Sequence, residues 1–443
     1  MDARPLARRL GLIDLLGVVM GAIIGVGIFF QPGVVMDRTG SATVALAAWG
    51  LGGAIALVGS LTFAELGGLF PRTGGQYHVL EASFGRPVAF LYCWSLLAVI
   101  QSGAVAIIAM ICVQFAATAM GLVAAESSQQ LWGAILIAGL TWINVRGVKG
   151  GGRLAAVTSG LKILMLLAII FVGLLVAGEP SQVGERLPRG DGRWALLLPG
   201  LVPVLFSYGG WQQGTYVAGE VENPERNVPL AIIGGVLGVV LLYVLYNFAL
   251  IRSLSPSEMV SAGQPVAAAM EARLGTWGGR MTALFVAASA FGVAAVCIMT
   301  APRMYKAMSD DGCFFAAFGG VHPRHRTPAP AILAQGGVAI LLVVLAGRRG
   351  VEYLTTGVVC VDWIFFTLTA IALFVLRRRR PDASRPYRAW GYPVLPAVFV
   401  LASGVAVAAT FLDAATRSAS VVAVAVVVTG LFLYALRTGF RSR

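Results

Sequence analysis

Long apolar stretches follow one another along the chain, separated by short polar interruptions. About 20 apolar residues in a helix span the ~30 Å hydrocarbon core of a bilayer. The pattern predicts an all-α polytopic membrane protein with twelve spanning helices, at residues 11–36, 42–70, 87–120, 130–146, 154–177, 196–219, 228–251, 280–309, 328–347, 351–376, 392–413 and 418–437. Because no loop between them is long enough for a soluble domain, we expect one transmembrane domain over residues 1–443.

Glycines interrupt the first and the sixth predicted helix near mid-span. Residues 23–29 read Ile-Ile-Gly-Val-Gly-Ile-Phe, and residues 206–211 read Phe-Ser-Tyr-Gly-Gly-Trp. Since glycine in a helix interior costs roughly 1 kcal/mol relative to alanine, both stretches predict local unwinding. The earlier Gly17 and Gly21 form a small-residue ridge with Gly25, and close helix packing explains those first two.

The spacing of the two breaks predicts an inverted repeat. Five helices separate equivalent positions, and an odd number reverses the orientation of the second unit in the membrane. We expect residues 11–177 and 196–376 to be related by a pseudo-twofold axis in the membrane plane, with a solute between the two broken helices. Residues 392–437 form two further helices outside the repeat.

Composition and charge support a membrane protein rather than a nucleic-acid-binding one. Hydrophobic residues make up 58% of the chain and charged residues 12%, and the mean hydropathy is +0.82. The net charge is +13, and most of the Lys and Arg residues fall on the side of the N-terminus. This bias predicts a cell-membrane protein with both termini in the cytoplasm, in contact with lipid at its helix ends and with no nucleic acid partner.

The chemistry of unwound backbone points to a zwitterion as the solute. Free amides at the start of a half-helix sit at a positive dipole end, which suits a carboxylate. Carbonyls released at the second break suit an ammonium group. The predicted substrate-binding residues are Ile23, Gly25, Val26, Gly27, Phe206, Ser207, Tyr208 and Gly209, with Phe206 as an aromatic gate.

Lys162 is the charge that the predicted helices bury most deeply. It lies about eight residues inside the fifth helix, roughly 12 Å from its start. A buried ammonium needs carbonyl or anionic partners. Lys162 therefore either couples transport, with or without carrying a proton, or extends to the interface as an anchor.

The other charges in the spans are interpreted as lying near helix ends, in gate pairs or solvated at the interface; they are Asp14, Glu65, Glu220, Arg303 and Asp362. No carboxylate is then expected in the pocket at the membrane midplane. That expectation argues against a cationic amino acid or polyamine as the dedicated substrate.

Metal, cofactor and enzyme chemistry find no support in the motifs. The five cysteines show no CxxC spacing, so neither a disulfide framework nor a metal site is expected. No HExxH motif or serine with a histidine base falls at membrane depth. Isolated breaks in apolar helices also differ from the continuous polar pore of a channel.

Several stretches resemble the amino acid-polyamine-organocation superfamily, and most closely the bacterial relatives of its L-type amino acid transporters. The resemblance covers nearly the whole chain; it is carried by residues 22–29, 205–211 and 220–231, and further by 71–77, His322-Pro323 with Pro328, and 385–393. It implies the five-plus-five (LeuT-type) fold with discontinuous first and sixth helices. It also implies alternating-access exchange of neutral L-amino acids; proton-coupled uptake by symport is the alternative.

The resemblance also assigns roles to individual residues. The amides of Val26 and Gly27 would bind the substrate carboxylate, and carbonyls at Ile23, Phe206 and Gly209 the ammonium group. Lys162 would replace a cation that related folds hold between helices one, five and eight. Relatives commonly carry serine where this chain has Val26. Relatives with a disulfide-linked heavy subunit use a cysteine between helices three and four, and residues 121–130 contain none.

Overall fold

The computed structural model describes residues 10–70, 74–123, 125–147, 151–176, 196–216, 218–346 and 350–441. These residues form helices and no β-strand; an isolated bridge pairs Leu10 with Val221. The α-helices are α1 (Leu12–Ile23), α2 (Gly27–Thr39), α3 (Ala42–Leu69), α4 (Gln76–Phe84), α5 (Arg86–Ser95), α6 (Gln101–Ala119), α7 (Glu126–Arg146), α8 (Gly151–Leu175), α9 (Leu197–Tyr208), α10 (Gln213–Tyr216), α11 (Pro224–Ile251), α12 (Pro256–Ser261), α13 (Pro265–Asp310), α14 (Ala329–Leu345), α15 (Gly350–Arg379), α16 (Val394–Leu412) and α17 (Ala414–Arg441). A π-helical stretch, Leu96–Ile100, joins α5 to α6, and 3-10 turns cover Ala218–Glu220 and Ala316–Gly319.

Seven helical segments in the described residues are long and apolar enough to cross a membrane. The pair α1 and α2, bent by 41°, adds an eighth span. The protein is therefore an all-helical membrane protein, while length and composition alone give fewer spans than the twelve expected. The difference lies in α7, α8, α14 and the α9–α10 pair. The break stops α9 after 12 residues, and α14 has 17, so both are shorter than a full span.

Both predicted interruptions are present. The first break, Ile24–Val26, separates α1 from α2, and the second break, Gly209–Gln212, separates α9 from α10. Gly275 kinks α13 at φ 70°, so the residues before it form a separate first arm of that helix.

Three local expectations differ from the structure. Helices α4 and α12 were not predicted; α12 is only six residues long and begins with a capping box between Ser255 and Glu258. The packing interpretation of Gly17 is wrong, because a Cβ atom there would meet no atom within 4 Å.

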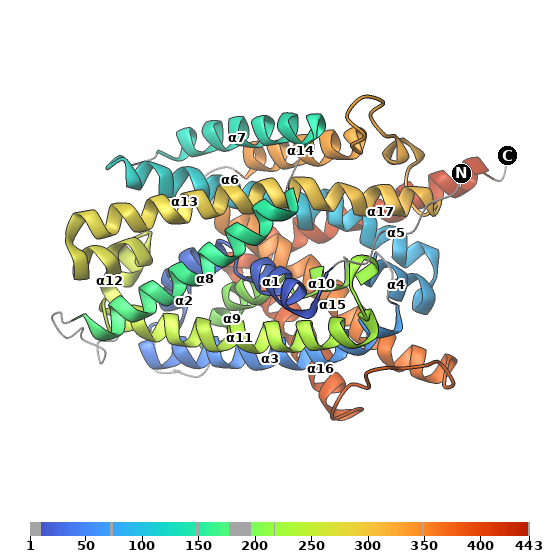
Figure 1. The fold of residues 1–443 in the computed structure, drawn as a ribbon, viewed down its shortest axis with the longest axis horizontal. Helices are drawn as coiled ribbons and strands as arrows, with labels where there is room; N and C mark the ends of the chain where they lie inside the picture. The colour runs from blue at the N-terminus through green and yellow to red at the C-terminus, as the bar shows by residue number, and fades with distance from the viewer. Residues whose placement is uncertain are drawn as a thin grey trace.

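The broken helices lie in the middle of the molecule (Figure 1). Helices α3 and α11 pack together along one side, and α7 and α14 along the other, with α6 against α13 between them and the centre. At the centre α1 packs on α10 and α2 packs on α9. Each half of the first broken helix therefore contacts the opposite half of the second.

An aromatic cluster supports the second break from one side. Trp211 packs on Phe366 of α15 with ring centroids 5.1 Å apart, and Phe63 of α3 contacts both rings edge-on. Trp363 completes the cluster next to Trp211. The rings fix the turn between α9 and α10 relative to α3 and α15.

Candidate functional site

The first break leaves consecutive backbone amides without acceptors. Helix α2 begins at Gly27, with Val26 as its N-cap residue. Within the described part of the chain, the amides of Val26, Gly27 and Ile28 make no backbone hydrogen bond, whereas Phe29 N already donates to Val26 O. Such amides at a helix N-terminus form a positive site that binds an anion. The predicted carboxylate-binding backbone is therefore free in this structure.

The carbonyls that the first break releases are held by neighbouring helices. The Gly25 amide donates to Ile23 O at 2.7 Å instead of to Gly21 O, the acceptor it would have in a continuous helix. Lys162 Nζ of α8 donates to Gly21 O at 3.2 Å, and the Tyr243 hydroxyl of α11 donates to Ile23 O at 3.0 Å. Tyr243 was not predicted, because the sequence does not show which helix faces the break.

Lys162 is buried, with 4% of its surface exposed. Its ammonium group contacts α1 three residues before the break, and its helix α8 packs on both α1 and α13. Helices α1, α8 and α13 are the first, fifth and eighth of the predicted spans. The structure therefore brings Lys162 to the three-helix junction that the resemblance indicates.

The second break contains a tight turn at Gly210, a position that only glycine fits. Gly210 has φ 117°, in the region that favours glycine. A Cβ atom there would lie 2.7 Å from Ala22 O, so the turn contacts the end of α1 directly. The Gly209 amide donates to Phe206 O at 3.2 Å, and Gly209 O accepts no backbone hydrogen bond from the described residues.

The two breaks also meet at Gly27. A Cβ atom on Gly27 would lie 3.0 Å from Ser207 Oγ and 3.2 Å from Phe206 Cδ1. Beside this contact is a cavity of about 120 Å³, here called the pocket, lined by both breaks and by residues of α6, α13 and α15. The paired breaks thus face one shared cavity.

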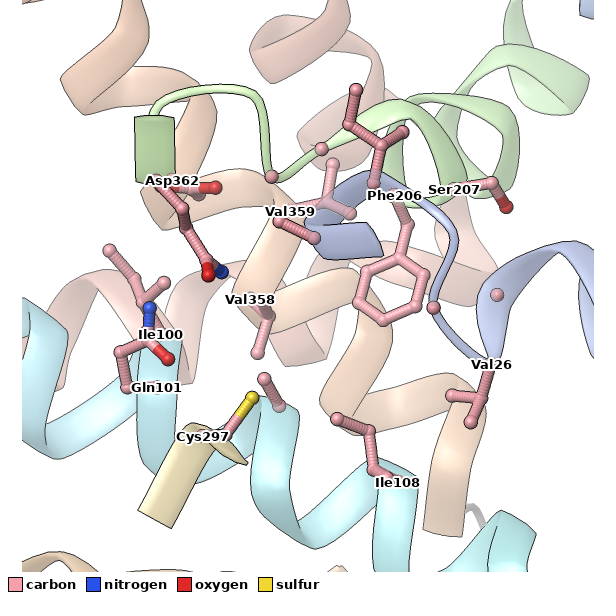
Figure 2. A pocket seen from close by; sticks show the side chains of 18 of the residues that line it. Val26, Ile100, Gln101, Ile108, Phe206, Ser207, Cys297, Val358, Val359 and Asp362 are labelled. Atoms are coloured by element: carbon pink, nitrogen blue, oxygen red, sulfur yellow. The ribbon is translucent and has the colours of Figure 1, made fainter. Parts of the chain in front are cut away.

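Seven of the eight predicted substrate-binding residues line the pocket, and they are Ile23, Gly25, Val26, Gly27, Phe206, Ser207 and Gly209. The Phe206 ring projects toward the middle of the pocket, while the Ser207 side chain points away from it (Figure 2). Tyr208 is the exception: it does not line the pocket, because its hydroxyl donates to Trp49 O at 3.1 Å and its ring packs on Trp49.

Asp362 lines the pocket, contrary to the expectation that no midplane carboxylate would face it. It lies twelve residues after the start of the 30-residue helix α15, roughly 18 Å along it. Figure 2 places Asp362 and Gln101 on the side of the pocket opposite Val26. Asp362 is at the middle of the predicted span 351–376, so its position in the sequence was a usable signal.

Gln101 is a further pocket residue that the sequence did not indicate. It begins α6 directly after the π-helical stretch Leu96–Ile100, and both Ile100 and Gln101 line the pocket. A π-helical turn shifts the helix face by part of a turn and is frequent at functional sites. Apolar spacing alone does not reveal such a turn.

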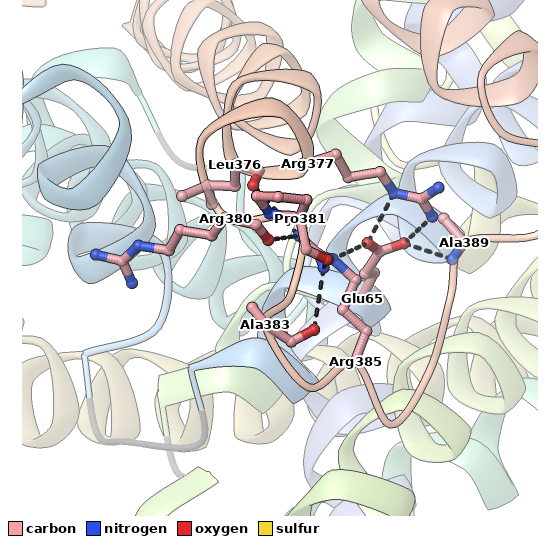
Figure 3. Close-up of polar contacts among 8 residues, drawn as sticks. All are labelled: Glu65, Leu376, Arg377, Arg380, Pro381, Ala383, Arg385 and Ala389. Carbon is pink, nitrogen blue, oxygen red and sulfur yellow. Dashed lines mark hydrogen bonds and ion pairs between the residues drawn. The ribbon is translucent and has the colours of Figure 1, made fainter.

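A second buried carboxylate, Glu65, lies at the end of α3 and is fully paired. Arg377 donates to it through Nε at 3.0 Å and Nη2 at 2.5 Å, and the Ala389 amide donates at 2.6 Å. Arg385 Nε forms an ion pair with it at 3.3 Å (Figure 3). Because the Glu65 side chain is 0% exposed, the interpretation of this residue as interface-solvated is wrong.

The loop after α15 is closed over Glu65 by the same arginines. The Arg385 guanidinium donates to four backbone carbonyls, at Leu376, Arg380, Pro381 and Ala383. Part of the motif at residues 385–393 thus holds α3 to the end of α15.

Comparison with known proteins decides the family. The sequence matches the amino acid permease family over residues 10–433. The chain belongs to the amino acid permease family. This permease is 32% identical over 404 residues to the serine/threonine exchanger SteT of Bacillus subtilis, covering 90% of each chain. It is therefore a membrane transporter and not an enzyme.

Two mammalian proteins are similar to the permease over most of its length. It is 30% identical over 392 residues to the human large neutral amino acids transporter small subunit 2, covering 86% of this chain and 72% of the relative. It is 30% identical over 388 residues to the rabbit b(0,+)-type amino acid transporter 1, covering 86% and 79%. The permease thus shares its family with amino acid transporters and exchangers.

Proposed function

We propose that the permease exchanges neutral L-amino acids across the cell membrane by alternating access and binds them in the pocket between the two breaks. The observation that carries this proposal is the contact of Gly27 with Phe206 and Ser207 beside a cavity lined by unwound backbone. The free amides of Val26 and Gly27 receive the α-carboxylate. The Gly209 carbonyl, which accepts no bond from the described backbone, receives the α-ammonium group.

The Ile23 carbonyl has a smaller part in this proposal than the resemblance implied. It already accepts hydrogen bonds from Gly25 N and the Tyr243 hydroxyl. A carbonyl has two lone pairs, so Ile23 O is saturated as the structure stands. Phe206 O accepts one bond, from Gly209 N, and keeps a lone pair for the substrate.

We infer an inverted repeat of residues 11–177 and 196–376 within a twelve-span domain, with residues 392–437 outside it. In such a repeat, spans five apart are equivalent. The equivalent pairs α3 and α11, α6 and α13, and α7 and α14 each pack together. The crossed packing of α1 on α10 and α2 on α9 agrees with the same axis.

The neutral substrate class is supported by the relatives, whose names describe exchange of serine and threonine or transport of large neutral amino acids. The cavity has a volume of about 120 Å³, several times the ~30 Å³ that one water occupies in the liquid. That room suits a small or medium-sized amino acid.

We propose that Lys162 couples the state of α1 to that of α8, since its ammonium group bonds the carbonyl that the break releases. A fixed positive charge there takes the place of a bound sodium ion, which it would repel. We further propose that both termini face the cytoplasm, that lipid surrounds the spans, and that no disulfide-linked heavy subunit is needed, since residues 121–130 contain no cysteine.

Counterflow into proteoliposomes tests the function. Vesicles loaded with each of the twenty amino acids are diluted into labelled L-alanine, with and without a pH gradient. We expect saturable uptake that depends on an internal neutral amino acid. Uptake that instead follows the pH gradient without internal substrate would favour proton symport, and no uptake of any amino acid would contradict the proposal.

A further inference from the structure

We propose that Asp362 forms a second polar subsite of the pocket, which accepts a hydrogen-bond donor at the end of the substrate side chain and binds a cationic amine most strongly. The inference rests on the proposed function, because it assumes that the pocket holds an amino acid. It extends the transported class to amino acids with a short basic side chain.

The Asp362 carboxylate has no partner among the described residues. It makes no hydrogen bond and no ion pair there, although it lies in the middle of an apolar helix. An ionised carboxylate removed from water costs several kcal/mol unless it is paired. A carboxylate left in this state beside a cavity is available to a ligand.

The protein's own cations and hydroxyls near the pocket are engaged elsewhere. Lys162 donates to Gly21 O and does not line the pocket. Tyr92 and Tyr216, the hydroxyl groups whose electrostatics Asp362 affects, hydrogen bond to each other at 2.8 Å, and Tyr92 also donates to Gln76. Arg377, further along α15, is bound to Glu65.

The place of Asp362 in the pocket suits the side-chain end of a substrate. The free amides at Val26 lie on one side of the pocket, and Asp362 and Gln101 lie on the other (Figure 2). A substrate anchored by its α-carboxylate at Val26 therefore extends toward Asp362. Of the other lining residues, Cys297, Val358 and Val359 carry no charge, and Gln212 and Gln213 carry uncharged amides.

Charge balance favours a cationic end over a neutral one. The two charges of the α-amino acid group are met by the amides of the first break and the carbonyls of the second. Asp362 makes no ion pair with a described residue, so a positive charge at the end of the substrate side chain can pair with it directly.

Competition in proteoliposomes tests the subsite with substrates that differ only at the end of the side chain. Norvaline and ornithine share a carbon chain, and ornithine adds the terminal ammonium; alanine and serine differ by one hydroxyl. Each competes against labelled L-alanine counterflow in the unmodified protein, in Asp362→Asn and in Glu81→Gln. Glu81 makes a partly exposed ion pair with Arg86, at 3.7 Å, and serves as the matched carboxylate control.

We expect ornithine to compete with alanine counterflow in the unmodified protein. Asp362→Asn should lower the apparent affinity of ornithine about tenfold more than that of norvaline. In Asp362→Asn the apparent affinity of serine should also fall more than that of alanine, but by a smaller factor. Glu81→Gln should leave the ornithine-to-norvaline and serine-to-alanine affinity ratios unchanged. An equal loss of apparent affinity for all four competitors would overturn the subsite, since Asp362 would then bind the α-ammonium group that they share. Alanine counterflow without any ornithine competition would overturn it too, while leaving the proposed function intact. Absence of all counterflow contradicts the function itself.

Discussion

Glu65 and Asp362 both lie within apolar helices, yet the pairing of their carboxylates differs. Glu65, at the end of α3, receives two arginines and one backbone amide. Asp362, at the middle of α15, receives no hydrogen bond or ion pair from the described residues. A carboxylate that holds segments together is fully paired within the protein, whereas one that faces a cavity can be left for a ligand.

Lys162 stands between these two cases. It is nearly as deeply buried as Glu65, but among the described residues its ammonium group donates to an uncharged carbonyl, Gly21 O. That carbonyl is free only because α1 is broken. The three groups therefore form a series from complete pairing to none, and their substitutions should have graded effects on stability.

The largest effect is expected at Glu65. Glu65→Gln leaves Arg377 and Arg385 without their anion, and removing one partner of a buried ion pair costs about 3–5 kcal/mol. Thermal or denaturant unfolding of the purified protein in detergent measures the loss. Glu81→Gln is the control, because its exposed pair with Arg86 contributes about 0–1 kcal/mol. Equal stability of the two variants would show that the Glu65 cluster holds nothing together.

Lys162→Met should have an intermediate effect, seen in transport more than in stability. Removing the ammonium leaves Gly21 O unsatisfied, which costs about 1–3 kcal/mol, and releases α1 from α8. We expect counterflow of labelled alanine to slow by about tenfold. The control is Lys306→Met, since Lys306 lies near the end of α13 and pairs with Asp310. Unchanged counterflow in Lys162→Met would remove Lys162 from the mechanism.

The smallest effect on stability is expected at Asp362. Asp362→Asn removes a charge that no described residue neutralises, so the free energy of unfolding should change by less than about 1 kcal/mol or should increase. The same unfolding assay compares it with Glu65→Gln. A loss as large as that of Glu65→Gln would mean that the protein pairs Asp362 after all, and the contrast between the two carboxylates would fail.

The helices and both breaks could be predicted because their signals are local in the sequence. Apolar length indicates a span, and glycine pairs at mid-span indicate unwinding, as at Gly25 with Gly27 and at Gly209 with Gly210. The pairing of the breaks followed from counting helices. These arguments need no knowledge of which helix face meets which.

The residues that were missed depend on side-chain direction across helices. Tyr243 reaches Ile23 O from α11, and Tyr208 turns away from the pocket to Trp49. Nothing in the spacing of α11 or α9 fixes these directions. Asp362 was misplaced for another reason: a charge inside an apolar span was assigned to its end, although it lies at the middle.

The central claim is that the two breaks together form the substrate site, and Gly209→Leu tests it most directly. A Cβ atom at Gly209 meets only backbone oxygens, at 3.4 Å and beyond, and the residue lines the pocket, so the side chain of a leucine there would occupy the cavity. Gly17→Leu is the matched control, because no atom lies within 4 Å of its Cβ position. The account predicts folded protein in both variants, with alanine counterflow lost in Gly209→Leu and kept in Gly17→Leu. Full counterflow in folded Gly209→Leu would contradict it.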